Sequence, residues 1–322
     1  MPDTLQLGLI GLGHLGKIHL KCLLQIPSIK LVGCYELDPE IVKQVSEEYK
    51  VKFFSDLGEL LRQCNAVDIV TPTSTHFTIA QQAMSLGKHC FIEKPVTQNL
   101  KEAYSLEILQ KEQGVKIQIG HVERYNPAFS AVLPFVKNAR FIEAHRLSSF
   151  NPRGTDVSVI HDLMIHDLDL ISLLAQSEPV EIRANGVNIV SKHPDICSAR
   201  IEFQSGLVAN VTASRISMKQ MRKFRIIQED AYISLDLASK EAQVIRLLDG
   251  YEDNTIELDT FKGKKFVKLE DLKIQSNNAI VDELTSFAKS ILEDKPCDVS
   301  LQDGIRALGL VENINKQMSR YL

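Results

Sequence analysis

The sequence predicts an α/β protein in which a doubly wound parallel sheet is followed by an α+β domain with a large, mostly antiparallel open sheet. Up to about residue 120, short apolar runs alternate with amphipathic stretches, a pattern typical of parallel strands buried on both faces. Beyond that point, strand-like runs follow one another without helices between them. A chain of 322 residues is long enough for two domains. We therefore expect domains at 1–122 and 123–322, with the C-terminal helix able to pack back on the first.

The N-terminal half contains six apolar runs that we predict to be strands. They are Leu5–Ile10, Ile29–Tyr35, Val51–Phe54, Ala66–Thr71, His89–Ile92 and Lys116–Ile119. Helical patterns occupy Phe77–Leu86 and Leu100–Gln113, with Gly87 placed where a helix end favours a left-handed residue. Ser55 is the expected N-cap of a further short helix, Asp56–Leu61.

The C-terminal half is predicted to be a strand-rich domain with helices at its start, in its middle and at its end. Helices are expected from Asn126 to about Val136, over Val157–Leu174, and near Ala279–Leu292 and Leu301–Met318. The expected strands are Arg140–Phe150, Val180–Val190, Ser198–Phe203, Leu207–Arg215, Phe224–Ile227, Tyr232–Leu235 and Ala242–Leu247. Ser205-Gly206 between two of them indicates a hairpin.

Composition excludes several classes of protein. The net charge of −4 argues against a general nucleic-acid-binding protein, which would carry a basic face. No stretch has the unbroken apolar length of a membrane helix, and the N-terminus lacks the pattern of a signal peptide. The six cysteines form no Cys-x-x-Cys pair, which indicates reduced thiols. We expect a cytoplasmic protein that binds neither membrane nor nucleic acid.

Gly11-Leu12-Gly13-His14-Leu15-Gly16 fits the pattern G-x-G-x-x-G, directly after a predicted strand and at the start of a predicted helix. Glu36 lies 20 residues beyond Gly16, at the end of the second predicted strand. Gly11 permits a tight turn, Gly13 allows close approach of a pyrophosphate, and Gly16 allows helix and strand to pack closely. The Glu36 carboxylate can accept hydrogen bonds from ribose hydroxyls and would repel a 2′-phosphate. The pattern predicts a Rossmann domain that binds NAD rather than NADP.

Two further segments carry residues suited to proton transfer. Lys94, between Glu93 and Pro95, closes a predicted strand, and carboxyl ends of such strands face the ligand crevice. Asp162 and His166 are four residues apart and would share one face of a helix. Either Lys94 or His166 could take a hydroxyl proton while hydride leaves for the nicotinamide, with Asp162 orienting the substrate.

A metal site is the alternative function for the helix that carries Asp162. His161, Asp162, His166 and Asp167 are all possible ligands, but His161 and His166 are five apart and would lie on different helix faces. We predict no metal there.

Four segments together resemble the glucose–fructose oxidoreductase/inositol dehydrogenase (Gfo/Idh/MocA) family. They are Gly11–Gly16, Thr71–His76, Glu93–Pro95 and Asp162–Asp167. The resemblance implies an NAD-dependent oxidoreductase that forms a homodimer or homotetramer through its C-terminal sheet, with His166 the base more often and Lys94 holding the hydroxyl. It also implies a set of cofactor-binding residues: Gly11, Gly13, His14, Leu15, Gly16, Glu36, Thr71, Pro72, Thr73, His76, Glu93 and Lys94.

Within that family, residues 120–127, 156–169 and 213–217 are most similar to the UDP-N-acetylglucosamine 3-dehydrogenase type. This likeness implies oxidation of the 3-hydroxyl of a UDP-N-acetylhexosamine. A diphosphate requires cations or backbone donors. The expected substrate-binding residues are Arg124, Tyr125, Asn126, Arg153, Arg215 and Lys219.

The sequence is also compatible with three other functions. A free sugar or polyol could be the substrate, or a reductase of this family could act on an acceptor such as a bilin. The third is a non-catalytic NAD-sensing regulator, since fold does not imply function. The presence of both Lys94 and His166 favours an enzyme over a regulator.

Overall fold

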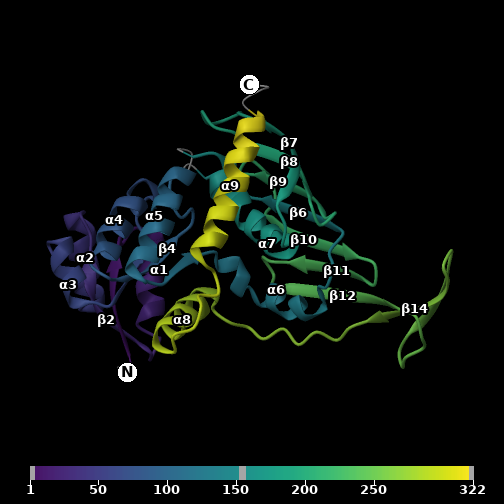
Figure 1. Ribbon diagram of the computed structural model, residues 1–322, viewed down its shortest axis with the longest axis horizontal. Coiled ribbons are helices and arrows are strands. Elements are labelled where there is room, and N and C mark those ends of the chain that lie inside the picture. The colour runs from purple at the N-terminus through teal and green to yellow at the C-terminus, as the bar shows by residue number, and fades with distance from the viewer. Residues whose placement is uncertain (1–3, 152–156, 319–322) are drawn as a thin grey trace. The chain divides into compact units, whose positions relative to one another are not determined.

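A computed structural model describes residues 4–151 and 157–318 (Figure 1). These residues divide into two compact units. Unit 1 contains the chain up to Val122 together with Asn278–Leu308. Unit 2 contains Glu123–Asn277 and the residues from Gly309 onward. Within the described residues, no helix is long and apolar enough to cross a membrane.

Unit 1 is built on a five-stranded sheet in the order β2-β1-β3-β4-β5, in which every neighbouring pair is parallel. Its strands are β1 (Leu5–Ile10), β2 (Ile29–Tyr35), β3 (Ala66–Ile69), β4 (His89–Glu93) and β5 (Ile117–Gly120). Its helices are α1 (His14–Leu23), α2 (Pro39–Tyr49), α3 (Leu57–Gln63), α4 (Thr73–Ser85), α5 (Leu100–Gln113), α8 (Ala279–Leu292) and the first part of α9 (Leu301–Met318). The strand order reverses at β1, and β1 and β3 therefore flank the switch point where such sheets bind ligands.

Two details of unit 1 differ from the predictions. Val51–Phe54 forms no strand of the sheet and makes only one isolated bridge, between Phe53 and Cys34. Asp56, rather than Ser55, caps the next helix, because its Oδ1 accepts the N–H of Glu59 at 2.8 Å. A carboxylate at this position reaches the third N–H of the helix and satisfies it.

Unit 2 is built on a nine-stranded sheet in the order β13-β14-β12-β11-β10-β6-β9-β8-β7. Its strands are β6 (Phe141–Leu147), β7 (Pro179–Val187), β8 (Ile196–Phe203), β9 (Val208–Ser214), β10 (Met221–Gln228), β11 (Ala231–Asp236), β12 (Glu241–Leu248), β13 (Ile256–Thr260) and β14 (Gly263–Leu269). Only the pair β6 and β9 is parallel, so the predicted mostly antiparallel open sheet is confirmed.

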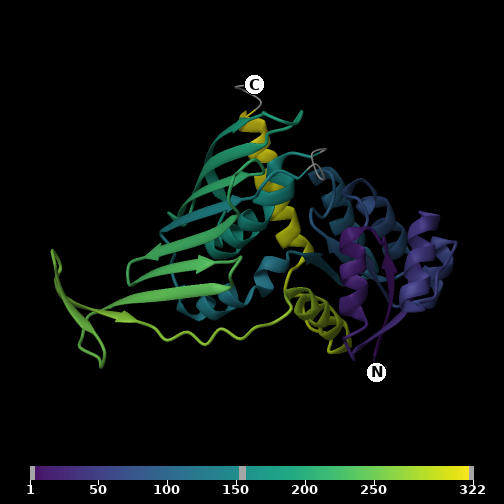
Figure 2. The same ribbon diagram turned by 180° about the vertical axis from the view of Figure 1, so that it is seen from behind.

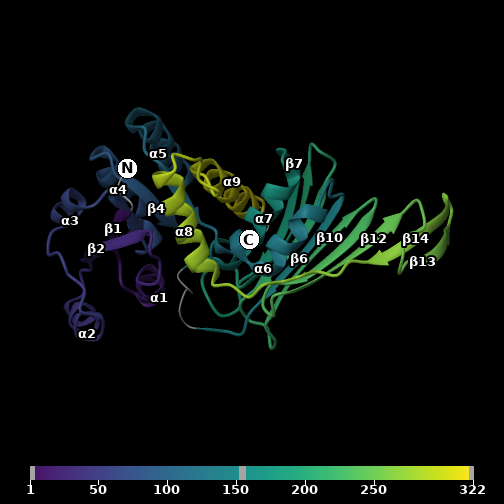
Figure 3. The same cartoon turned by 90° about the horizontal axis from the view of Figure 1, so that it is seen from below.

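Helices cover one face of this sheet, which is here called the inner face (Figure 3). α6 (Pro127–Val132) packs on β11 and β12, and α7 (Ile165–Ala175) packs on β6 and β9. Along β10 the inner side chains of Phe224 and Ile226 are buried, whereas Lys223 and Arg225 on the outer face are exposed. Figure 2 shows the outer face from behind. The alternation follows from the two-residue period of a strand with one covered face.

The hairpin of β13 and β14 was not predicted. Its residues are mostly exposed or half-buried, and it contains Lys262, Lys264 and Lys265, so it lacks the alternation of apolar side chains that marks a half-buried strand. Gly263, with φ of +102°, stands at the turn. Figures 1 and 3 show this hairpin at the far end of the unit 2 sheet. The hairpin joins the sheet through backbone hydrogen bonds between β14 and β12. Such bonds do not depend on the pattern of apolar side chains, so the sequence pattern could not predict them.

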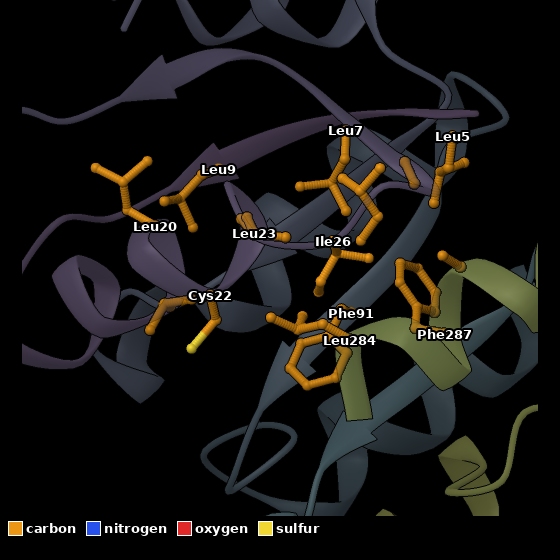
Figure 4. Close-up of a cluster of buried hydrophobic side chains, with 14 of the residues drawn as sticks. Leu5, Leu7, Leu9, Leu20, Cys22, Leu23, Ile26, Phe91, Leu284 and Phe287 are labelled. Carbon is orange, nitrogen blue, oxygen red and sulfur yellow. The ribbon is translucent and has the colours of Figure 1, made fainter. Parts of the chain in front are cut away.

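The apolar core of unit 1 joins segments from both ends of its sequence (Figure 4). Leu5, Leu7 and Leu9 of β1, Phe91 of β4 and Phe287 of α8 belong to one cluster of buried side chains. The rings of Phe91 and Phe287 meet edge to face, with centroids 5.8 Å apart. Complete burial of one such phenylalanine contributes about 1.5–3 kcal/mol. Helix α8, nearly 190 residues beyond β4 in the chain, is thus fixed on this sheet.

Candidate active site

The glycine loop follows β1 and opens α1, as predicted. Gly11 has φ of +92°, and a Cβ at this position would lie 2.8 Å from the carbonyl oxygen of Val70. A Cβ at Gly16 would lie 2.1 Å from the carbonyl oxygen of Gly11. Larger residues cannot occupy either position. Gly13 is exposed and has open space where a Cβ would be, which leaves the backbone accessible at the N-terminus of α1.

Glu36 follows β2 and turns its carboxylate toward this loop. Its Oε2 accepts the N–H of Leu12 at 2.7 Å, and its Oε1 accepts those of Leu37 and Asp38 at 2.7 and 3.0 Å. The carboxylate is therefore held at the carboxyl end of the sheet beside the glycine loop. This is where a dinucleotide places its adenosine ribose. A cofactor with free ribose hydroxyls fits this site, because the fixed negative charge can accept their hydrogen bonds.

His76 of α4 ties two loops of unit 1 together. Its Nε2 lies 2.9 Å from the carbonyl oxygen of Thr71, and its Nδ1 lies 2.9 Å from that of Pro95. Burial lowers the pKa of His76, although these carbonyl oxygens oppose the shift. Pro72 stands at the N-cap of α4 and Thr73 begins the helix, so both lie at the carboxyl end of β3. Their expected contacts with the cofactor stay a prediction.

Lys94 directly follows β4, on the same edge of the sheet as the glycine loop. Its side chain is half-buried, and its backbone N–H donates to Oε2 of Glu93 at 3.1 Å. The Lys94–Pro95 peptide bond is cis. The carboxylate of Glu93 is only 7% exposed and faces the interior of unit 1. Its other oxygen, Oε1, lies 3.2 Å from Nε2 of His19, a residue that the sequence analysis did not single out.

In unit 2, Asp162 and His166 lie at the junction of two kinds of helix. Ile160–Met164 forms a π-helical turn, and α7 begins at Ile165. In an uninterrupted α-helix, residues four apart lie on one face. The wider turn, closed by i→i+5 bonds, shifts Asp162 around the axis relative to His166. Such turns often occur at functional sites.

A buried ion-pair network fixes α7 on the inner face of the unit 2 sheet. Arg146 of β6 donates through Nε and Nη2 to the two oxygens of Asp167, at 2.9 and 2.8 Å, and through Nη1 to Glu123 at 2.8 Å. Desolvation lowers the pKa of Arg146, but the two carboxylates outweigh it and keep the guanidinium charged. Arg222, opposite Arg146 in the register, lies 3.6 Å from the same Glu123 oxygen. Asp167 adjoins His166, so the network sets the position of that histidine's backbone.

The substrate-binding residues predicted from the sequence differ in burial and in hydrogen-bond partners within unit 2. The guanidinium of Arg124 donates to both oxygens of Asp169, at 2.8 and 2.6 Å, and its side chain is 8% exposed. Asn126 caps α6 by accepting from Ala128 N–H and is 6% exposed. The backbone carbonyl of Tyr125 accepts from Asn277.

The remaining predicted cations are dispersed. Arg215 is buried and donates to the carbonyl of Val157 at 2.7 Å, which ties the end of β9 to the segment before the π-helical turn. Lys219 is exposed. Arg153 lies outside the described residues. Contact of any of these six residues with a substrate stays a prediction.

A glycine loop at the switch point, a fixed acid after β2 and a lysine after β4 define unit 1 as the dinucleotide-binding domain of an NAD-dependent oxidoreductase. Residues 5–121 match the model of the Gfo/Idh/MocA oxidoreductase family with an NAD-binding Rossmann fold. Residues 136–234 match the model of the Gfo/Idh/MocA C-terminal domain. The chain belongs to this family.

Comparison with individual proteins agrees with this assignment. The UDP-N-acetylglucosamine 3-dehydrogenase of Acidithiobacillus ferrooxidans is 37% identical over 294 residues, which are 90% of each chain. Its solved structure superposes with a TM-score of 0.88 over 99% of both chains. The scyllo-inositol 2-dehydrogenase (NAD+) of Bacillus subtilis is 27% identical and covers 97% of this chain and 96% of its own. A scyllo-inositol dehydrogenase from Lactobacillus casei, solved with NAD(H) and scyllo-inositol, shares the fold at 19% identity with a TM-score of 0.78, over 99% of this chain and 98% of its own.

Proposed function

We propose that this NAD-dependent oxidoreductase oxidises the 3-hydroxyl of a UDP-N-acetylhexosamine to a ketone. The observation that carries the proposal is the 37% identity, over 90% of both chains, to a relative named for that reaction. Identity to the relative that acts on scyllo-inositol is ten points lower over a similar span. A free polyol is therefore the second candidate substrate.

Three residues would divide the work on the substrate. NAD, when bound, supplies the acceptor for the hydride. Lys94 and His166 are the groups able to hold and remove the hydroxyl proton, and Asp162 would orient the substrate or the histidine. The presence of an amine, an imidazole and a carboxylate supports an enzyme rather than an NAD-sensing regulator.

Binding of the nucleotide part of the substrate is the most direct test of the proposed UDP-sugar specificity. UDP alone, titrated calorimetrically in the presence of NAD, is expected to bind, because its phosphates can pair with Lys219, the exposed cation of the predicted substrate-binding set. Lys219→Ala should weaken that binding about tenfold, the value of one charge-assisted hydrogen bond. Lys192→Ala, which removes another exposed lysine of unit 2, is the matched control. If UDP does not bind while a free polyol is turned over, the nucleotide-sugar assignment is wrong.

Cofactor preference is expected to follow the charge of Glu36. Fluorescence titration should show NADH binding more tightly than NADPH, because a 2′-phosphate would face a carboxylate that three backbone N–H groups hold in place. Glu36→Gln keeps the shape of the side chain and removes its charge. The ratio of the NADPH dissociation constant to the NADH dissociation constant should therefore fall toward one. Glu40→Gln, on the exposed surface of α2, should leave the ratio unchanged. Equal affinities in the wild type would remove Glu36 from cofactor selection.

We also propose that the outer face of the unit 2 sheet mediates homodimer or homotetramer formation. Exposed apolar side chains there include Ile227 of β10 and Tyr232 of β11, which are paired neighbours across the two strands. A cytoplasmic location stays a prediction from the sequence.

A further inference from the structure

Four ionisable side chains from distant parts of the sequence meet inside unit 1. His19 comes from α1, Asp68 from β3, Glu93 from β4 and Glu283 from α8. His19, Asp68 and Glu283 are fully buried, and Glu93 is 7% exposed. Three of them, His19, Glu93 and Glu283, offer ligand atoms that all lie within 4.8 Å of one another. We call these four residues the acid–histidine cluster.

The imidazole of His19 has a carboxylate on each side. Its Nδ1 lies 2.9 Å from Oδ2 of Asp68, and its Nε2 lies 3.2 Å from Oε1 of Glu93. A carboxylate accepts and does not donate when ionised, so both ring nitrogens must carry hydrogen for both contacts to be favourable. Burial alone would lower the pKa of His19, but the two acids outweigh it and raise that pKa well above its usual value. Nδ1 makes a hydrogen bond with Asp68, whereas Nε2 and Glu93 are at ion-pair distance without hydrogen-bond geometry. Two carboxylates this close to one buried imidazole favour an imidazolium by charge balance.

Glu283 differs from the other two acids. Neither of its carboxylate oxygens has a hydrogen-bond partner among the described residues, and no part of it is exposed. Burial, reinforced by the nearby Glu93, raises the pKa of Glu283 well above its usual value. An isolated buried carboxylate is too costly to stay ionised, so Glu283 is the neutral acid of the cluster.

Glu93 connects this cluster to Lys94. While Oε1 faces His19, Oε2 accepts the backbone N–H of Lys94 at 3.1 Å. Gly120, paired with Glu93 across β4 and β5, leaves the necessary room, because a Cβ there would lie 2.6 Å from Oε1. The Glu93 carboxylate is thereby fixed between a charged histidine inside the domain and the backbone of the lysine at its edge.

We propose that His19 is a positioning residue for Lys94: as an imidazolium held by Asp68, it fixes the Glu93 carboxylate, which in turn fixes the main chain that aims the lysine. The inference rests on the proposed role of Lys94 in catalysis. It also gives Glu93 a different task from the cofactor contact expected from the sequence. A divalent cation held by His19, Glu93 and Glu283 is the competing explanation, and it would need Nε2 of His19 to be deprotonated.

The protonation state can be tested on the wild-type protein without any substrate. In ¹⁵N NMR spectra of histidine-labelled enzyme at pH 8, one imidazole is expected to show two slowly exchanging ring N–H signals, both lost in His19→Gln. The exposed imidazole of His193 serves as the internal reference for fast exchange. A neutral His19, or one divalent metal ion per chain in elemental analysis of the same sample, would overturn the proposal.

The positioning role is tested by kinetics with whichever substrate the enzyme turns over. His19→Gln and Glu93→Gln should each lower kcat about tenfold to a hundredfold, as small misplacements of a reacting group do, with little change in the KM for NAD. Glu283→Gln is the matched control from the same cluster, because replacing a neutral acid by a neutral amide should alter kcat less than about twofold.

A double-mutant cycle separates positioning from general destabilisation. If His19 acts through Lys94, His19→Gln should cost little in the residual rate of a Lys94→Ala background. Equal losses in both backgrounds, or a Glu283→Gln variant as impaired as Glu93→Gln, would show that the cluster only stabilises the fold. Failure of UDP to bind would leave all of these measurements valid, since they do not depend on the identity of the sugar.

Discussion

Replacing Lys94 by alanine is expected to lower kcat about a thousandfold or more, which leaves only a residual rate. The lysine lies at the carboxyl end of β4, where its amine can hold or accept the hydroxyl proton as the hydride departs. Its removal should leave NADH affinity within a few-fold of the wild type, because the glycine loop and Glu36 lie on other strands. Steady-state kinetics and fluorescence titration measure the two effects separately.

Two further substitutions define what the lysine contributes. Lys94→Arg keeps the positive charge but cannot readily release a proton, so it should restore little activity if proton transfer matters. Lys101→Ala removes an exposed lysine of α5 in the same unit and should be silent. Near-normal turnover of Lys94→Ala would exclude this residue from the mechanism.

The second large effect is expected at His166. His166→Asn should lower kcat about a hundredfold to ten-thousandfold, the range for removal of a positioned general base. In the wild type, kcat should rise with pH as the base loses its proton, and this limb should disappear in the variant. Asp162→Asn should cost less, because an orienting group does not itself take the proton.

The control for His166 is His145, which lies on the outer face of the sheet beside Glu143 at 3.1 Å. His145→Asn should keep both the rate and the pH profile. If His166→Asn retains the wild-type profile, the role of base passes to Lys94. The pH profiles of the two variants thus decide between the residues that the sequence left as alternatives.

Local patterns predicted much of this protein. Continuous apolar runs predicted all five parallel strands to within about two residues, because a strand buried on both faces needs apolar residues throughout. Helices α8 and α9 begin and end where their periodicity indicated. The glycine loop and Glu36 were recognisable because backbone geometry and ribose binding depend on residues at fixed spacing. The π-helical turn that carries Asp162 was not predicted, because such a turn leaves no clear mark in the sequence.

Only the tertiary structure brought together residues that share no local pattern. The acid–histidine cluster joins residues up to 264 positions apart in the sequence: His19, Asp68, Glu93 and Glu283. Nothing in the sequence around any one of them indicates that they meet. Their meeting depends on how α1 and α8 pack on the sheet, and that packing is set by apolar contacts such as Phe91 with Phe287. Likewise, the sequence predicted that Arg124 binds a phosphate of the substrate, whereas in the structure its guanidinium is paired with Asp169. The sequence determined which chemical groups the protein has and which strand ends carry them, whereas the packing decided which charges are paired, because burial makes an unpaired charge costly.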